Sequence, residues 1–162
     1  MKRIAPALAL VLAAAALPAQ AAPARAGPVE TISYETGPCF GRCPVYRVTV
    51  RSDGRGSFEG IRFTAFTGTR PFRLTRAQYL AFARRLAPDR PAQGERHYQP
   101  GTPLCRQAAT DLPSVSIVWR GRGAQSLYVY YGCDRRQNGA MFDRLSSAPA
   151  LLPIGDFIAP TR

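Results

Sequence analysis

The chain has 162 residues, a net charge of +12 and a single lysine, Lys2. No residue after Lys2 can therefore serve as a catalytic lysine. One histidine, His97, ten scattered carboxylates, and no phosphate-binding glycine loop or zinc-ligand set argue against the common enzyme classes. Excess arginine favours an anionic partner, although scattered arginine in an Ala-, Pro- and Gly-rich chain is also typical of a GC-rich genome. No long basic run is present, so we do not expect nucleic-acid binding.

The N-terminus has the pattern of a cleavable signal peptide over residues 1–21. Met1-Lys2-Arg3 supplies positive charge, an apolar run extends to Leu17, and Ala19-Gln20-Ala21 supplies small residues for cleavage. The run is shorter than the roughly 20 residues of a membrane span, so an uncleaved anchor is the less favoured alternative. We therefore predict a periplasmic or secreted protein, with a net charge of +10 once Lys2 and Arg3 are removed.

The rest of the chain fits one domain without a transmembrane segment. We expect a flexible leader over residues 22–28, a single domain over 29–158 and a short tail over 159–162. The alternation of Tyr46, Val48 and Val50 against polar neighbours predicts a half-buried strand, and Ser52-Asp53-Gly54 predicts a hairpin turn. The strands expected in this first half are Val29–Thr36, Val45–Arg51, Gly56–Arg62 and Phe63–Thr67, with Arg70–Leu74 leading out.

A helix is expected to begin after Thr75, which forms a capping box with Gln78, and to end at Pro88. The segment from Asp89 to Thr110, rich in Pro, Gly and Gln, is expected to be irregular. Beyond it, the sequence predicts strands over Ser114–Arg120 and Gln125–Tyr131, a helix over Asn138–Ala148, and an apolar tail that packs back on the domain. This order predicts an α+β fold, a mainly antiparallel sheet built from hairpins with two helices on one face.

Four cysteines in an exported chain are expected to form two disulfides. Three pairings are possible, and we favour Cys39–Cys43 with Cys105–Cys133. The chain-entropy relation assigns about 2 kcal/mol to the short loop and about 3.6 kcal/mol to the long one. The alternative is that Cys39 and Cys43, with His97 as a third ligand, bind copper or act as a redox-active thiol pair, because thiolates select Cu(I). The C-x-x-x-C-P spacing resembles the copper loop of Sco-type assembly proteins over Cys39–Pro44 alone.

A longer resemblance begins at the same loop. Cys39-Phe40-Gly41-Arg42-Cys43-Pro44-Val45-Tyr46, the alternating strand after it and Asp53-Gly54 resemble the opening signature, CFGxCPxY, of the bacterial domain of unknown function 6438 family. Thr110-Asp111-Leu112-Pro113 and Tyr131-Gly132-Cys133 also resemble this family. The resemblance implies an exported or envelope-associated domain. It implies no catalytic residue, because the family brings no established activity.

The function that we expect from the sequence is therefore a non-enzymatic envelope module. Its partner would be an anionic envelope surface or an envelope protein, bound through an arginine-rich, tyrosine-bearing sheet face. The candidate contacts are Arg42, Tyr46, Tyr128 and Tyr130. No catalytic residue and no cofactor is assigned, the copper alternative aside, and the sequence leaves the oligomeric state open.

Overall fold

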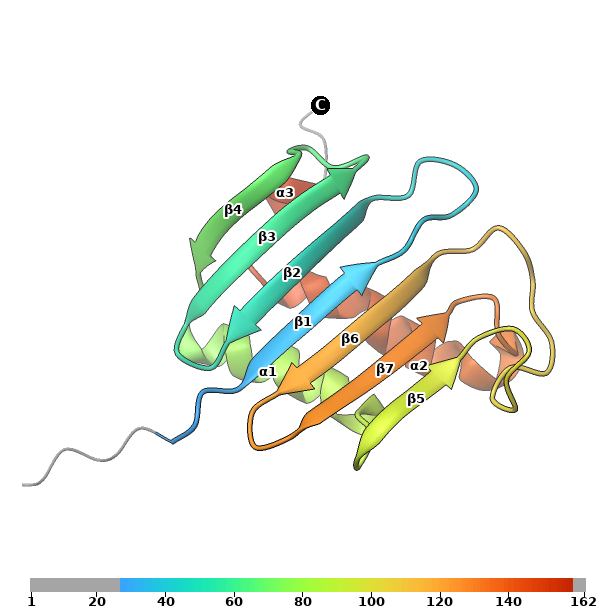
Figure 1. Cartoon of the computed structure of the whole chain (residues 1–162). Coiled ribbons are helices and arrows are strands. Elements are labelled where there is room, and N and C mark those ends of the chain that lie inside the picture. The colour runs from blue at the N-terminus through green and yellow to red at the C-terminus, as the bar shows by residue number, and fades with distance from the viewer. Residues whose placement is uncertain (1–26, 159–162) are drawn as a thin grey trace, which may run out of the picture.

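The computed structural model describes residues 27–158, which form one mixed, mostly antiparallel seven-stranded sheet with helices on one face (Figure 1). The predicted signal peptide and the tail over residues 159–162 lie outside the described residues. The strands follow the order β4-β3-β2-β1-β6-β7-β5 across the sheet. Their bounds are β1 Thr31–Thr36, β2 Val45–Arg51, β3 Arg55–Arg62, β4 Gly68–Arg73, β5 Gly94–Tyr98, β6 Ser114–Arg120 and β7 Ala124–Tyr130. The predicted α+β class is confirmed.

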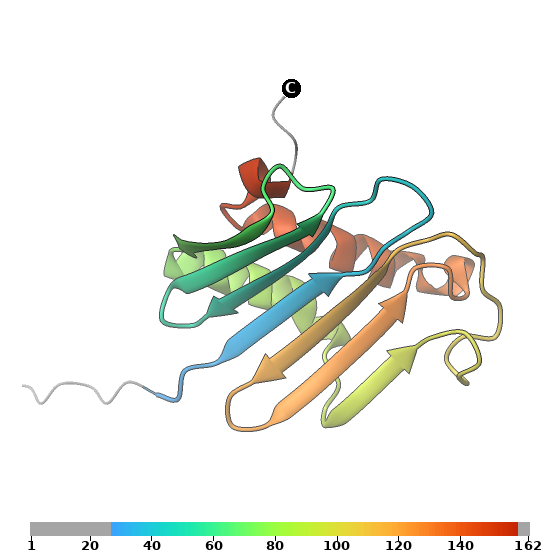
Figure 2. The same ribbon diagram turned by 45° about the horizontal axis from the view of Figure 1, so that its top comes forward.

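The helices cover one face of the sheet in both views (Figures 1 and 2). Helix α1 begins after Thr75, whose side chain forms the expected capping box with Gln78, and it buries a stripe of Tyr79, Phe82 and Leu86. The helical elements are α1 Arg76–Leu86, η1 Ala87–Asp89, α2 Arg135–Ser147, η2 Ala148–Leu151 and α3 Gly155–Ile158. Within residues 27–158, no helix is both long and apolar enough to cross a membrane.

The core lies between the helix layer and the sheet, and the apolar side chains that alternate along the strands are part of it. Tyr34, Phe58 and Trp119 are its largest members from the sheet, and all three are almost fully buried. The C-terminal segment adds Leu152 and Ile154, so the apolar tail packs back on the domain as expected. Because most of the apolar residues of the strands face the helices, the opposite face of the sheet is predominantly polar.

The fourth strand begins later than predicted. We expected a strand over Phe63–Thr67, but Phe63 has a φ of +57°, and the chain forms a loop before β4 starts at Gly68. A left-handed residue cannot continue a strand. A side chain at Gly60 would meet the carbonyl of Phe66, so the missing Cβ is what lets the loop fold back over β3.

The segment that we expected to be irregular contains a strand. β5 pairs in parallel with β7 and forms the edge of the sheet, whereas the other pairs are antiparallel. Its sequence, Gly-Glu-Arg-His-Tyr, does not alternate apolar and polar residues. An edge strand buries few of its side chains, so it can consist mainly of polar residues. The prediction was wrong for Gly94–Tyr98, because charged edge strands leave no hydrophobic signal.

Candidate functional site

The helices leave one face of the sheet uncovered (Figure 1). On that face, strand register places the polar residues in three rows, each of which crosses several strands. The first, which we call the arginine row, contains Arg73 of β4, Arg55 of β3, Arg51 of β2 and Arg120 of β6. Arg55 lies directly opposite Arg73, and Thr31 of β1 lies between Arg51 and Arg120. Along its strand, each arginine is next to a residue whose side chain faces the helices. Because side chains alternate between the two faces of a strand, all four arginines belong to the open face.

The second row consists of short side chains, most of them hydroxyls, and we call it the hydroxyl row. Strand register places its members side by side from β4 to β7: Pro71, Ser57, Thr49, Ser33, Val118 and Ser126. Its serines and threonine are half-buried. The Thr49 hydroxyl lies 3.4 Å from that of Ser33.

In the third row, the bridging row, one arginine lies between two carboxylates, so its ions are paired and its centre carries one excess negative charge. Arg47 of β2 contacts Glu35 of β1 and Glu59 of β3, each at 2.8 Å. Hydrogen bonding to Glu35 raises the pKa of Arg47 further above its usual value. The row continues through Ser116 and Tyr128 to His97, which lies beside Tyr128 on the edge strand.

Charge balance is absent from the arginine row. Asp53, in the turn between β2 and β3, contacts Arg51 at 2.9 Å and Arg55 at 3.9 Å. The hydrogen bond from Arg51 lowers the pKa of Asp53, so this carboxylate stays ionised. Arg73 and Arg120 are exposed, and neither takes part in an ion pair with any residue that the structure describes. Four cations therefore face one anion.

The four candidate contacts named from the sequence are not brought together. Arg42 is exposed on the β1–β2 loop, where its guanidinium lies 5.4 Å from the centre of the Phe63 ring. Tyr46 must be corrected, because it is only 5 % exposed and packs in the core between Tyr34 and Phe58. It shares the helix-facing side of β2 with Val48 and Val50 and is closed to a ligand.

The other two candidates lie on the open face. Tyr128 belongs to the bridging row, with its ring centre 6.2 Å from that of His97. Tyr130 is half-buried and has a structural contact, since its hydroxyl accepts a hydrogen bond from the backbone N–H of Leu112 at 3.3 Å. Of the four candidates, only Tyr128 belongs to one of the three rows.

The cysteines form two disulfides, Cys39–Cys43 and Cys105–Cys133, the pairs favoured from the sequence. Gly41 turns the short loop with a φ of +127°, a region that favours glycine. His97 hydrogen-bonds Glu95 on β5, while both sulfurs of the β1–β2 loop are bonded to each other. In the part of the chain that the structure describes, no three His, Cys, Asp or Glu side chains gather as a metal site, so the alternative copper ligands are not assembled.

Comparison with family models explains the loop signature. The model of a domain of unknown function, DUF6438, matches residues 30–147, which include all seven strands, α1 and α2. The chain belongs to the DUF6438 family. This result confirms the resemblance seen in the CFGxCPxY segment. No match is found among curated proteins.

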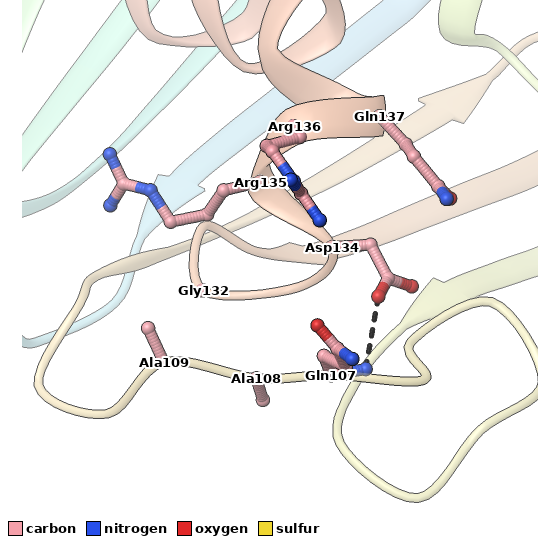
Figure 3. A pocket seen from close by; sticks show the side chains of 8 residues that line it. All are labelled: Gln107, Ala108, Ala109, Gly132, Asp134, Arg135, Arg136 and Gln137. Carbon is pink, nitrogen blue, oxygen red and sulfur yellow. Dashed lines mark hydrogen bonds between the residues drawn. The ribbon is translucent and has the colours of Figure 1, made fainter.

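The DUF6438 domain also has an open pocket where α2 begins (Figure 3). Arg135, Arg136 and Gln137 line one side of this pocket, and the segment Gln107–Ala109 lines the other. The carboxylate of Asp134 lies at its mouth and accepts hydrogen bonds from the backbone N–H groups of Arg106 and Gln107, each at 2.9 Å. A negative group thus stands where the helix terminus would attract an anion, and its role is to hold the long segment in place.

Buried phenols form a second polar cluster, inside the core. Burial raises the pKa of Tyr131 to about 12 and that of Tyr34 further. The Tyr34 hydroxyl donates to the carbonyl of Leu145 at 3.1 Å. These groups stay protonated near neutral pH and cannot act as bases there, so the cluster holds strands to α2 without offering proton-transfer chemistry.

Sequence reasoning missed the arginine row of the DUF6438 domain. A partial signal existed, because Arg51 and Arg120 fall opposite the apolar positions of their strands. The turn at Ser52-Asp53-Gly54 also implied that Arg51 and Arg55 face each other. The positions of Arg73 and Arg120 in the same row depended on the register of β4 and on the pairing of β1 with β6, which alternation does not encode.

Proposed function

We propose that this chain is an exported, non-enzymatic module that binds an anionic partner of the cell envelope through the arginine row. The observation that carries the proposal is the set of four arginines on one line of the open face with a single carboxylate among them. Charged residues without local compensation, gathered on one surface, attract ligands of opposite charge.

The register makes this arrangement costly for the folded chain. Arg55 and Arg73 are directly opposite each other on neighbouring strands, and like charges in that position destabilise a sheet. The same face shows how such repulsion is avoided, since Glu35 and Glu59 flank Arg47 in the bridging row. A row of cations that lack ion-pair partners, on the same face as a row whose arginine is paired, favours a role in binding over a role in folding.

Export is supported by the disulfides and by the sequence of the N-terminus. Paired cysteines persist in oxidising compartments and are rare in the cytosol. The positive, apolar and small-residue segments over residues 1–21 follow the signal-peptide pattern. We infer that the domain works in the periplasm or outside the cell, where anionic glycans and phospholipid head groups are accessible.

Salt-dependent binding tests the proposal directly. The oxidised protein is titrated with vesicles of anionic phosphatidylglycerol and with soluble polyglutamate, over a range of salt concentrations, and neutral phosphatidylcholine vesicles serve as the reference. We compare Arg73→Gln/Arg120→Gln with Arg135→Gln/Arg136→Gln, which removes the same charge at the start of α2. The logarithm of affinity should fall linearly with the logarithm of salt, and the slope should decrease by about two in the row variant.

The two variants separate a site from general charge. In the row variant, affinity for anionic probes should drop by about tenfold or more at low salt, whereas the α2 variant should stay within about twofold of the parent. Equal losses in both variants would contradict the proposal. Binding to neutral vesicles as strong as to anionic ones would also contradict it.

A further inference from the structure

We infer that the partner is a linear acidic polysaccharide that lies across the strands along the hydroxyl row, with its carboxylates directed toward the arginine row. This inference rests on the proposed function and specifies its ligand. Its basis is the juxtaposition of two parallel rows, one of cations and one of hydroxyls, over the same strands.

The four arginines lie along one line across the strands and do not spread over the whole open face. The row crosses five strands, β4 to β6, and with a spacing of about 4.8 Å between strands it spans about 19 Å. A flat anionic surface laid on the open face would also meet Glu35, Glu59 and Glu95, which share this face. A chain that follows one line over β4 to β6 meets the arginines and stays clear of Glu35 and Glu59. Glu95 lies opposite Ser126 at the end of the hydroxyl row, two strands beyond β6.

The hydroxyl row indicates what lies next to the anionic groups. Ser57, Thr49 and Ser33 are adjacent on three neighbouring strands, two residues along each strand from the arginine row. Each hydroxyl can both donate and accept a hydrogen bond, which suits a ligand that also has hydroxyls. A polymer of acidic sugars combines carboxylates and hydroxyls in a regular repeat.

The shape of the face agrees with a chain-like occupant. Side chains in the hydroxyl row are short, whereas arginines stand on one side of it and the longer side chains of the bridging row on the other. Arg47 pairs with both carboxylates at the centre of the bridging row, so the repulsion of an anionic chain is reduced there. Tyr128, two residues from Ser126 on β7, adds an aromatic ring that can contact a sugar.

A lipid bilayer fits this part of the surface less well. Surfaces that insert into a bilayer combine cations with large apolar side chains. The most exposed apolar residue described is Phe40, 86 % accessible, and it lies with Ile61 at the other end of the strands. The most exposed apolar side chain therefore lies away from the arginine row.

Three probes distinguish the ligand classes at low salt, all with the oxidised parent protein. Oligogalacturonates of increasing length carry carboxylates and hydroxyls, polyglutamate carries carboxylates without hydroxyls, and phosphatidylglycerol vesicles present an anionic area. Affinity for oligogalacturonate should rise with length until the ligand spans about 19 Å and then level off. At matched charge and length, polyglutamate should bind about threefold more weakly or worse.

Variants test the path of the ligand without changing the net charge. Ser33→Tyr places a bulky group at the centre of the hydroxyl row and should weaken oligogalacturonate binding by about tenfold or more. Ser33→Ala/Ser57→Ala removes two hydroxyls from the row, and the matched control Thr67→Ala/Ser146→Ala removes two exposed hydroxyls elsewhere. The first pair should weaken oligogalacturonate binding and leave polyglutamate binding unchanged; the control pair should alter neither. Circular dichroism and thermal melting verify that each variant is folded.

The outcomes separate this inference from the proposed function. The assignment of a polysaccharide ligand would be overturned by any of three results: equal affinity for polyglutamate and oligogalacturonate, tighter binding to vesicles, or unchanged binding by the Ser33→Tyr variant. In those cases the anion-binding function would survive if Arg73→Gln/Arg120→Gln still weakened the probe that binds. No binding of any anionic probe at low salt would overturn both.

Discussion

At one end of the sheet, both disulfides hold the long connections, whereas the other end has short turns and the arginine row. Cys39–Cys43 closes the β1–β2 loop, and Cys105–Cys133 ties the segment before β6 to the residues after β7. At the opposite end, β2 joins β3, and β6 joins β7, through tight turns at Gly54 and Gly121–Gly123. The first end is fixed by covalent bonds and the second by backbone geometry.

The difference separates stability from recognition within one sheet. The loops at the disulfide end are held by backbone hydrogen bonds as well as by the disulfides. The backbone N–H of Phe40, for example, donates to the carbonyl of Asp111 at 3.2 Å, and such contacts do not depend on surface charge. The arginine end has connections too short to need a cross-link, so it can tolerate the repulsion of unpaired cations. We therefore expect changes at the two ends to affect different measurements.

The largest effect on stability should follow removal of the long disulfide. Cys105→Ala/Cys133→Ala should lower the free energy of unfolding by about 3.6 kcal/mol, because the cross-link restricts a 29-residue loop in the unfolded chain. Denaturant titration under non-reducing conditions measures this value. Where the variant is still folded, its affinity for anionic probes should equal that of the parent.

The short disulfide serves as the control for that variant. Cys39→Ala/Cys43→Ala should cost about 2 kcal/mol, since its loop is only five residues long. A larger loss from the short disulfide than from the long one would contradict the loop-entropy account. A loss of binding in either folded variant would contradict the separation of the two ends.

An intermediate effect is expected for Glu30, which precedes β1 at the arginine end. Burial opposes its ionisation, but hydrogen bonds from Tyr79 and Arg90, each 2.7 Å long, outweigh burial and lower its pKa below the ordinary 4.5. The ionised group therefore stabilises the fold above about pH 4.5, and this contribution is lost as the pH falls through the folded-state pKa. Glu30→Gln should cost about 1 kcal/mol at pH 7 and progressively less in acid.

Urea titrations of the parent and of Glu30→Gln from pH 7 down to about pH 3 measure whether their free energies of unfolding become equal in acid. Glu95→Gln, an exposed carboxylate on β5, provides the reference for the loss of one negative charge. A difference between parent and Glu30→Gln that grows as the pH falls would contradict the assignment.

The smallest effect on stability should come from Arg73→Glu, and its sign should be opposite. The new carboxylate would face Arg55 directly, so repulsion becomes attraction and the free energy of unfolding should rise by about 0.5 kcal/mol. Affinity for anionic probes should fall in the same variant. Thermal melting and probe titration measure the two effects, with Arg84→Glu on α1 as the charge-matched control. A variant that is less stable, or that binds as before, would show that Arg73 is not kept for recognition.

The elements with a strong hydrophobic period were predictable from the sequence. The alternation of Tyr46, Val48 and Val50 located β2, and Thr75 with Gln78 located the start of α1. Two features were missed for physical reasons. β5 is a charged edge strand with little to bury, and the left-handed Phe63 interrupts what reads as a continuous strand.

The candidate site was less predictable than the fold because it depends on register. Placing Arg55 opposite Arg73 requires the exact start of β4, and adding Arg120 requires that β6 pair with β1. A one-residue slip of β4 or β6 would move the arginine of that strand to the helix-facing side. The interpretation of Tyr46 as a surface contact failed for a simpler reason, because the periodicity of its own strand already placed it in the core.

The central place of β1 has a consequence for assembly. One neighbour of β1 is β2, the next strand along the chain, but the other is β6, which begins only at Ser114. The meander from β1 to β4 can form from local pairings, whereas closing the sheet requires a long loop to be drawn together first, which slows folding. Until β6 docks, one edge of β1 remains open to pairing with other chains, and a molecule that is still folding is most prone to aggregate during that interval.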